Sequence, residues 1–238
     1  MGTGCQTPVS HRSPQGCPPG ATATATGSVL QGGGVDVTTA VRSRRMCRRF
    51  DLTRPVPDEV LDELLDLAVR APSAGHTQGW EWVVLTDAEE RAAFWAATTD
   101  GGPPDRWLRG VQAAPVLVLA LSDKQAYLDR YAEPDKGWTD RSEENWPVPY
   151  WDTDVAMASM ILLLAAQERG LGSLFFGVPA HAHTAVKETF GIPDRLRIVG
   201  VIAVGHPDPE QPSPRSPSLR RGRRRLADIV HRGRYRAV

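Results

Sequence analysis

The chain has 238 residues, 41% of them hydrophobic and 24% charged, which suits one globular domain with appendages. Lysine and arginine together number 28, as do aspartate and glutamate, so the zero net charge gives no global argument for nucleic acid or membrane binding. Three scattered cysteines form no disulfide framework, and the longest apolar run, 155–166, is too short to cross a bilayer. The N-terminus has no basic region followed by an apolar stretch, so we expect a cytoplasmic protein.

Residues 1–35 are rich in Gly, Pro, Ser and Thr and include the pieces "ATATATG" and "GGG". Such low-complexity segments cannot bury a hydrophobic core. We therefore predict a disordered leader over 1–35 and a folded domain over 36–238. Cys5 and Cys17 lie in the leader without a second pair nearby, and we expect no metal site.

Hydrophobic periodicity predicts the elements of the folded region in chain order. Helices are expected over 36–44, 57–70 and 87–97, with Asp87 as an N-cap, and then over 154–169 and 181–190. Strands are expected over 80–86, 114–122, 173–178 and 196–205, and a short helical piece near 226–230 in the basic tail 207–238. Because the order lacks strict βαβ alternation, we expect an α+β fold with a mostly antiparallel central sheet flanked by helices.

Two segments are unusually rich in arginine. One, "RSRRMCRRFD" over 42–51, holds five arginines in ten residues, and the other, "SLRRGRRRLADIVHRGRY", spans 218–235. The guanidinium fork matches phosphate oxygens, so such clusters can hold a phosphate. Taken alone, the 42–51 segment fits a solvated basic face or a nucleic-acid patch as well as it fits a phosphate site. The 218–235 segment taken alone is more typical of a nucleic-acid patch than of a phosphate site.

Two further segments are loops or strand ends with chemistry-bearing residues. "APSAGHTQGWEWVV" over 71–84 connects a helix to a strand and can present hydrogen-bonding groups to a polar ring edge. "GLGSLFFGVP" over 170–179 contains Gly177, which would let another molecule approach the backbone closely. Taken alone, an ordinary helix-to-strand loop is the better interpretation of the first segment, and a helix cap followed by a core strand is the better interpretation of the second.

Together, in this order, the four segments resemble the nitroreductase family. That family carries Arg-Arg-Ser-x-Arg-x-Phe, then Ala-Pro-Ser-x-x-Asn-x-Gln-Pro-Trp, then a Gly-Leu-Gly segment and a basic tail. The matching segments here read "RRMCRRF", "APSAGHTQGW", "GLGSLFFG" and "RRGRRRL", and the resemblance covers about residues 36–235. It implies a homodimer that binds FMN at its interface.

The resemblance also implies which residues contact the flavin. The expected cofactor-binding residues are Arg44, Arg45, Met46, Arg48, Pro72, Ser73, His76, Phe176, Gly177, Val178, Arg221 and Arg223. The arginines would hold the phosphate and ring edge, the 72–76 loop would lie around the ring, and the 176–178 strand end would offer a backbone N–H toward flavin N5. Met46, His76 and Gly79 depart from the family's Ser, Asn and Pro. We hypothesise that a protonated His76 would stabilise the reduced flavin.

The implied activity is transfer of electrons from NAD(P)H to a small nitroaromatic- or quinone-like acceptor by a ping-pong cycle. No Gly-x-Gly-x-x-Gly follows a predicted strand, so a Rossmann dinucleotide site is not expected. No acid–base pair stands out, and we name no catalytic side chain. The alternatives are a flavin-dependent dehydrogenase, oxidase or dehalogenase on the same scaffold, and a nucleic-acid-binding protein that uses the arginine clusters.

An aromatic and proline-rich insert over 123–151 stands out from the rest of the chain. Residues 107–151 hold four of the seven tryptophans, and "ENWPVPYWD" is stiffened by two prolines. We predict that the insert lies over the flavin and that Trp146 and Tyr150 bind the acceptor. An aromatic subunit interface is nearly as good an interpretation.

Overall fold

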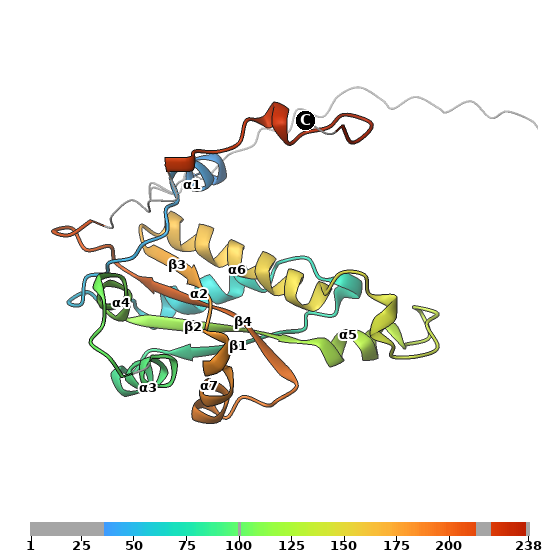
Figure 1. Ribbon diagram of the computed structural model, residues 1–238, viewed down its shortest axis with the longest axis horizontal. Coiled ribbons are helices and arrows are strands. Elements are labelled where there is room, and N and C mark those ends of the chain that lie inside the picture. Colours follow the sequence, from blue (N-terminus) through green and yellow to red (C-terminus); the bar gives the residue numbers. More distant parts are fainter. Residues whose placement is uncertain (1–35, 100, 213–219, 237–238) are drawn as a thin grey trace, which may run out of the picture. The chain divides into compact units, whose positions relative to one another are not determined.

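The structure is a computed structural model that describes residues 36–99, 101–212 and 220–236, all of which belong to one unit of the chain (Figure 1). The leader predicted over 1–35 lies outside the described residues. The helices are α1 (Val37–Ser43), α2 (Asp58–Ala68), α3 (Ala88–Thr98), α4 (Arg106–Gln112), α5 (Lys124–Tyr131), α6 (Tyr150–Glu168) and α7 (His183–Phe190). The strands are β1 (Trp80–Leu85), β2 (Val116–Asp123), β3 (Gly172–Phe176) and β4 (Leu196–Gly205). Short 3-10 turns are η1 (Ala74–His76), η2 (Glu143–Asn145), η3 (Ala180–Ala182) and η5 (Leu226–Asp228).

Within the described residues, the strands form a four-stranded sheet in the order β1-β2-β4-β3, with every neighbouring pair antiparallel. The expectation of an α+β fold with an antiparallel central sheet is therefore confirmed. The β2–β4 register shifts between Ala120 and Leu121, whose partners are Gly200 and Ile198, so β4 carries one extra residue at this point, as in a β-bulge.

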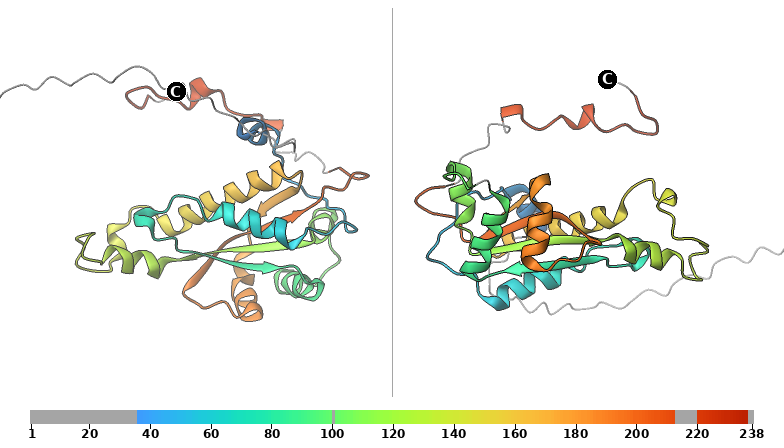
Figure 2. Two further views of the ribbon diagram at one scale, coloured as in Figure 1. Left: turned by 180° about the vertical axis from the view of Figure 1, so that it is seen from behind. Right: turned by 60° about the horizontal axis from the view of Figure 1, so that its bottom comes forward.

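Helices cover both faces of the sheet (Figures 1 and 2). Because successive strand side chains point to opposite faces, β2 alternates between two core clusters. Val116 and Val118 pack with Leu64 of α2 and Leu162 of α6, whereas the alternate positions of β2 pack with residues of α3 and α7. This two-sided burial explains why the β2 sequence is almost continuously apolar.

Most predicted elements are present, and two helices were missed. Helices α4 and α5 were not expected because they are short and polar, and each depends on a capping residue at its start. Asp105 accepts a hydrogen bond from the Leu108 N–H (2.7 Å), and Asp123 accepts one from the Ala126 N–H (3.3 Å). Among the described helices, none is long and apolar enough to span a membrane.

Candidate functional site

The arginine segment, residues 44–48, runs along the free edge of β3. Met46 forms a parallel bridge with Ser173, and the Cys47 N–H donates to the Ser173 carbonyl (2.9 Å). The Met46 side chain packs against both core clusters, which anchors the segment to the sheet. The backbone of the predicted phosphate-binding segment is thus fixed by the sheet edge.

Helix α4 packs against both the arginine segment and the end of β3. An ideal Cβ on Gly110 would lie 2.1 Å from the carbonyl oxygen of Arg48, so the helix can pack here only because residue 110 is glycine. On the same helix, Trp107 meets Phe176 edge to face, with ring centroids 6.0 Å apart. Through α4 and β3, the structure brings Arg48 and Phe176 into one region.

The guanidinium groups of the arginine segment differ in their hydrogen bonding. Arg45 donates to the carbonyls of Arg42 (2.8 Å) and Arg44 (2.9 Å). Arg48 donates to the carbonyl of Met46 (3.2 Å). By contrast, Nε and Nη1 of Arg44 are buried and have no hydrogen-bond partner among the described residues. A buried charged donor without an acceptor is costly, so this group fits an anion such as a phosphate.

A cavity of about 300 Å³ opens at the end of β3. Its lining includes the predicted residues Phe176, Gly177 and Val178 together with Trp95 and Trp107. Trp95 stacks on Phe176 with ring planes 9° apart and centroids 5.8 Å apart. An ideal Cβ on Gly177 would meet no atom within 4 Å, so glycine is not needed here for packing and leaves space for a bound group. The aromatic walls and the open glycine fit a flat ring such as that of FMN.

The 71–78 loop is held in an unusual backbone conformation. Gly75, His76 and Gln78 all have positive φ, of 63°, 55° and 54°. This left-handed region is unfavourable for most side chains, but Asn and His enter it more readily than others. The positive φ at residue 76 is thus a physical reason why histidine can stand where the family has asparagine.

Two side chains that sequence reasoning missed hold this loop from far along the chain. The Ala74 N–H donates to Asp154 (2.8 Å), and Nε of Arg130 donates to the Gly75 carbonyl (3.1 Å). Within the loop, the Gln78 N–H donates to Ser73 Oγ (3.0 Å). No local sequence signal could have shown these partners, because they lie 80 and 55 residues from the loop.

The 71–78 loop and the arginine segment lie at opposite corners of the sheet. Ser173 pairs with Val204, which pairs with Val116, whereas Trp80, which follows the loop, pairs with Ser122. The two corners are thus six residues apart along β2 (122 − 116), or about 20 Å, and three strand spacings apart, or about 14 Å. One chain therefore does not bring Pro72, Ser73 and His76 to the arginines.

The predicted acceptor residues lie in an aromatic cluster of the insert. The Trp146 ring contacts the rings of Tyr127, Tyr131, Trp138, Tyr150 and Trp151, with centroids 4.6–6.0 Å apart. Trp146 is partly buried there, whereas Tyr150, the first residue of α6, is 41% exposed. Their contact with an acceptor stays a prediction.

The tail arginines are exposed. Arg221 and Arg223 both lie on the surface of the described tail, near a local ion pair between Arg225 and Asp228 (2.8 Å). The convergence of Arg221 and Arg223 with Arg44 on one phosphate stays a prediction, as does a flavin contact of Met46.

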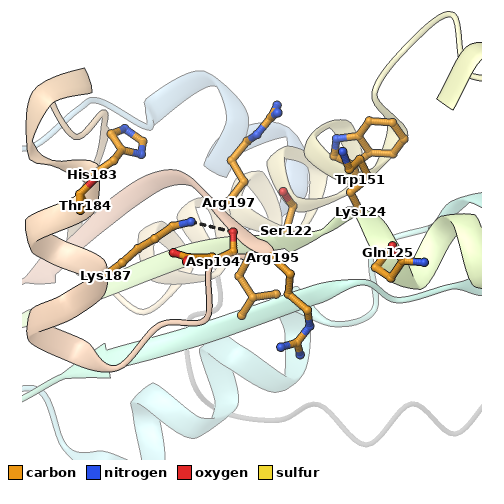
Figure 3. A pocket seen from close by; sticks show the side chains of 11 residues that line it. Ser122, Lys124, Gln125, Trp151, His183, Thr184, Lys187, Asp194, Arg195 and Arg197 are labelled. Atoms are coloured by element: carbon orange, nitrogen blue, oxygen red, sulfur yellow. Dashed lines mark hydrogen bonds between the residues drawn. The ribbon is translucent and has the colours of Figure 1, made fainter.

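Another cavity, of about 370 Å³, is polar and basic (Figure 3). Its cations are each paired: Lys124 with Glu143, Arg195 with Asp123, Arg197 with Asp152, and Lys187 with the Asp194 carbonyl. In Figure 3, the side chains of Arg195 and Arg197 extend in opposite directions. Paired and diverging cations suit a bound phosphate less well than the unpartnered Nε and Nη1 of Arg44.

Comparisons with known proteins give relatives in sequence and in fold. Residues 41–206 match the model of the Nitroreductase family. An NADH dehydrogenase of Thermus thermophilus is 30% identical, over 77% of this chain and 93% of that protein. A putative NADH dehydrogenase/NAD(P)H nitroreductase of Archaeoglobus fulgidus is 29% identical, over 72% and 85%. The solved structure of an FMN-dependent nitroreductase of Clostridium difficile has a TM-score of 0.58 and 23% identity, over 82% of this chain and 98% of that one, and shows the likeness of fold.

Proposed function

Because the chain belongs to the Nitroreductase family and is an NAD(P)H-dependent oxidoreductase, we propose that it uses FMN to pass electrons to a small nitroaromatic- or quinone-like acceptor in a ping-pong cycle. The observation that carries the proposal is that Nε and Nη1 of Arg44 are buried without a hydrogen-bond partner among the described residues, on the same sheet edge as the cavity at Phe176 and Gly177. These matches give no support to the alternative of a nucleic-acid-binding protein.

When bound, FMN supplies a ring that takes up hydride from NAD(P)H and gives electrons to the acceptor. The chain's own part is binding and orientation. Arg44, Arg45 and Arg48 would neutralise the phosphate and hold it at the β3 edge, with Arg221 and Arg223 closing on it from the tail. At the other end of β3, the open backbone of Gly177 and Val178 would face flavin N5, and the stacked Phe176 and Trp95 would exclude water from that side.

A homodimer would complete this site. Since the 71–78 loop lies at the opposite corner of the sheet from the arginine segment, a second copy would supply the loop to each flavin. Apolar side chains available for such an interface lie on α6 and α1: Met157 and Met160 are 36% and 37% exposed, and Val41 is 51% exposed. Isologous pairing through α6 would bury them. The cytoplasmic location expected from the sequence stays a prediction.

Purification followed by anaerobic titration tests the proposal. We expect a yellow protein that releases one FMN per chain and that loses its flavin absorbance when NADH or NADPH is added without oxygen. Re-oxidation by a quinone or nitroaromatic in a subsequent mixing step would support the ping-pong cycle. A protein that neither retains nor rebinds FMN would contradict the proposal, and a flavin that neither nicotinamide bleaches would favour the dehydrogenase or oxidase alternative.

A further inference from the structure

Asp154, on α6, is a buried carboxylate outside the proposed flavin contacts. Its side chain is 1% exposed, and it forms no ion pair within the described part of the chain. Burying a carboxylate without a cation is costly unless several donors satisfy it. Two donors do so, both at 2.8 Å: the backbone N–H of Ala74 and the hydroxyl of Tyr127. Neither donor belongs to α6, so the carboxylate links the helix to other parts of the chain.

Tyr127 is the other member of this link. It is fully buried on α5, and burial and the hydrogen bond to Asp154 both raise the pKa of its phenol, which keeps the hydroxyl protonated and able to donate at neutral pH. Its ring lies against Gly79, at the end of the 71–78 loop. The Asp154–Tyr127 pair thus contacts the loop at Ala74, in its middle, and the chain at Gly79, directly after the loop.

The loop needs such support because its backbone is strained. His76 and Gln78 occupy the left-handed region, which a side chain adopts only when the surroundings impose it. The hydrogen bond from Ala74 to Asp154 fixes the residue just before this strained run. Arg130 adds a bond to the Gly75 carbonyl, and its own orientation is set by an ion pair with Asp135 (2.7 Å).

We propose that Asp154, with Tyr127, is a positioning residue that holds the 71–78 loop in the conformation in which Ser73 and His76 contact the flavin. The inference rests on the proposed function. It adds to that function a residue that acts on the flavin only through the loop. Helix α5 belongs to the aromatic insert and carries both Tyr127 and Arg130, so the role of this part of the insert would be to hold the 71–78 loop. Loss of the Asp154 acceptor would free the loop and loosen the flavin ring without touching the phosphate contacts of the arginine segment.

The test compares Asp154→Asn with Ser159→Ala in the full-length chain. Ser159 is a matched control, because it is a buried polar residue of the same helix whose hydroxyl donates to the Val155 carbonyl of that helix (2.8 Å). Tyr127→Phe is a further variant, since it removes one donor and keeps the ring against Gly79. The readouts are hydrogen exchange of the amides of residues 74–79, the FMN dissociation constant, and the visible circular dichroism of the bound flavin.

We expect Asp154→Asn to speed exchange in the loop and weaken FMN binding by about tenfold each, because the amide oxygen would accept the bonds from Ala74 and Tyr127 without the assistance of a charge, and to change the flavin dichroism. Tyr127→Phe should act in the same direction with a smaller effect, and Ser159→Ala should change neither readout. Unchanged loop exchange in Asp154→Asn, or equal effects of Asp154→Asn and Ser159→Ala, would overturn the inference. If the proposed function were wrong, the unmodified chain would not bind FMN. Hydrogen exchange in the loop of the Asp154→Asn variant would still show whether Asp154 positions the loop.

Discussion

The ring of Tyr127 occupies the space in which a side chain at residue 79 would lie. An ideal Cβ on Gly79 would stand 2.5 Å from Cε2 of Tyr127 and 3.1 Å from the carbonyl oxygen of Asp123. Real Cβ atoms essentially never come as close to another atom as the first of these distances, and the second is tighter than most real contacts. The proline that the resembling family has at this place is therefore incompatible with a buried tyrosine on α5, and glycine and Tyr127 belong together.

Gly79→Ala should destabilise the fold by about 1–3 kcal/mol, because the added methyl group overpacks a region bounded by Tyr127 and by backbone. In a Tyr127→Leu background the same change should cost clearly less, since the smaller side chain leaves room. Urea unfolding of the single and double variants gives both values. An equal penalty in the two backgrounds would show that Tyr127 is not the residue that requires the glycine.

Arg44→Ala should weaken FMN binding by at least about tenfold, because a charge-assisted bond to the phosphate is lost. Arg44→Lys should restore only part of the affinity, since lysine keeps the charge without the planar fork. Arg49 is the matched control in the same cluster: its guanidinium donates to Gln211, and Arg49→Ala should bind FMN as before. Equal affinities of the two alanine variants, measured by fluorescence titration, would rule out the special role of Arg44.

Gly177→Val should leave the flavin-free protein as stable as before, within about 0.5 kcal/mol, because nothing lies within 4 Å of its Cβ position. It should nevertheless weaken FMN binding, since the side chain would enter the proposed ring pocket. Gly102→Val is a control with the same empty surroundings, outside the cavity lining. Thermal unfolding without flavin and titration with FMN separate the two effects. A Gly177→Val protein with full FMN affinity would argue against a ring at this strand end.

His76→Val should cost about 1–2 kcal/mol of stability, because a β-branched residue is strained at φ 55°, whereas His76→Asn should cost almost nothing. If a protonated His76 also stabilises the reduced flavin, His76→Asn should change how the midpoint potential of the flavin depends on pH. Chemical unfolding and potentiometry measure these two roles independently. A potential that varies with pH identically in both proteins would leave His76 with the backbone role alone.

Local pattern was sufficient for most of the elements and for the arginine segment. The strand over 196–205 was predicted with the bounds that the structure has, and Asp87 forms the expected cap of α3. Both depend on neighbours a few residues away, which the sequence displays directly. Helix α5 was missed because its residues are mostly polar and Tyr127 is buried only by partners elsewhere in the chain.

The sequence by itself determined the family resemblance, the sheet's strands and the residue types available to a flavin. Only the tertiary structure decided where those residues lie. It placed the arginine segment beside β3 and the 71–78 loop at the far corner of the sheet, and it put Asp154 against the loop backbone from 80 residues away. The reason is physical: strand order and the burial of a single carboxylate follow from the packing of the whole chain, which no window of the sequence contains.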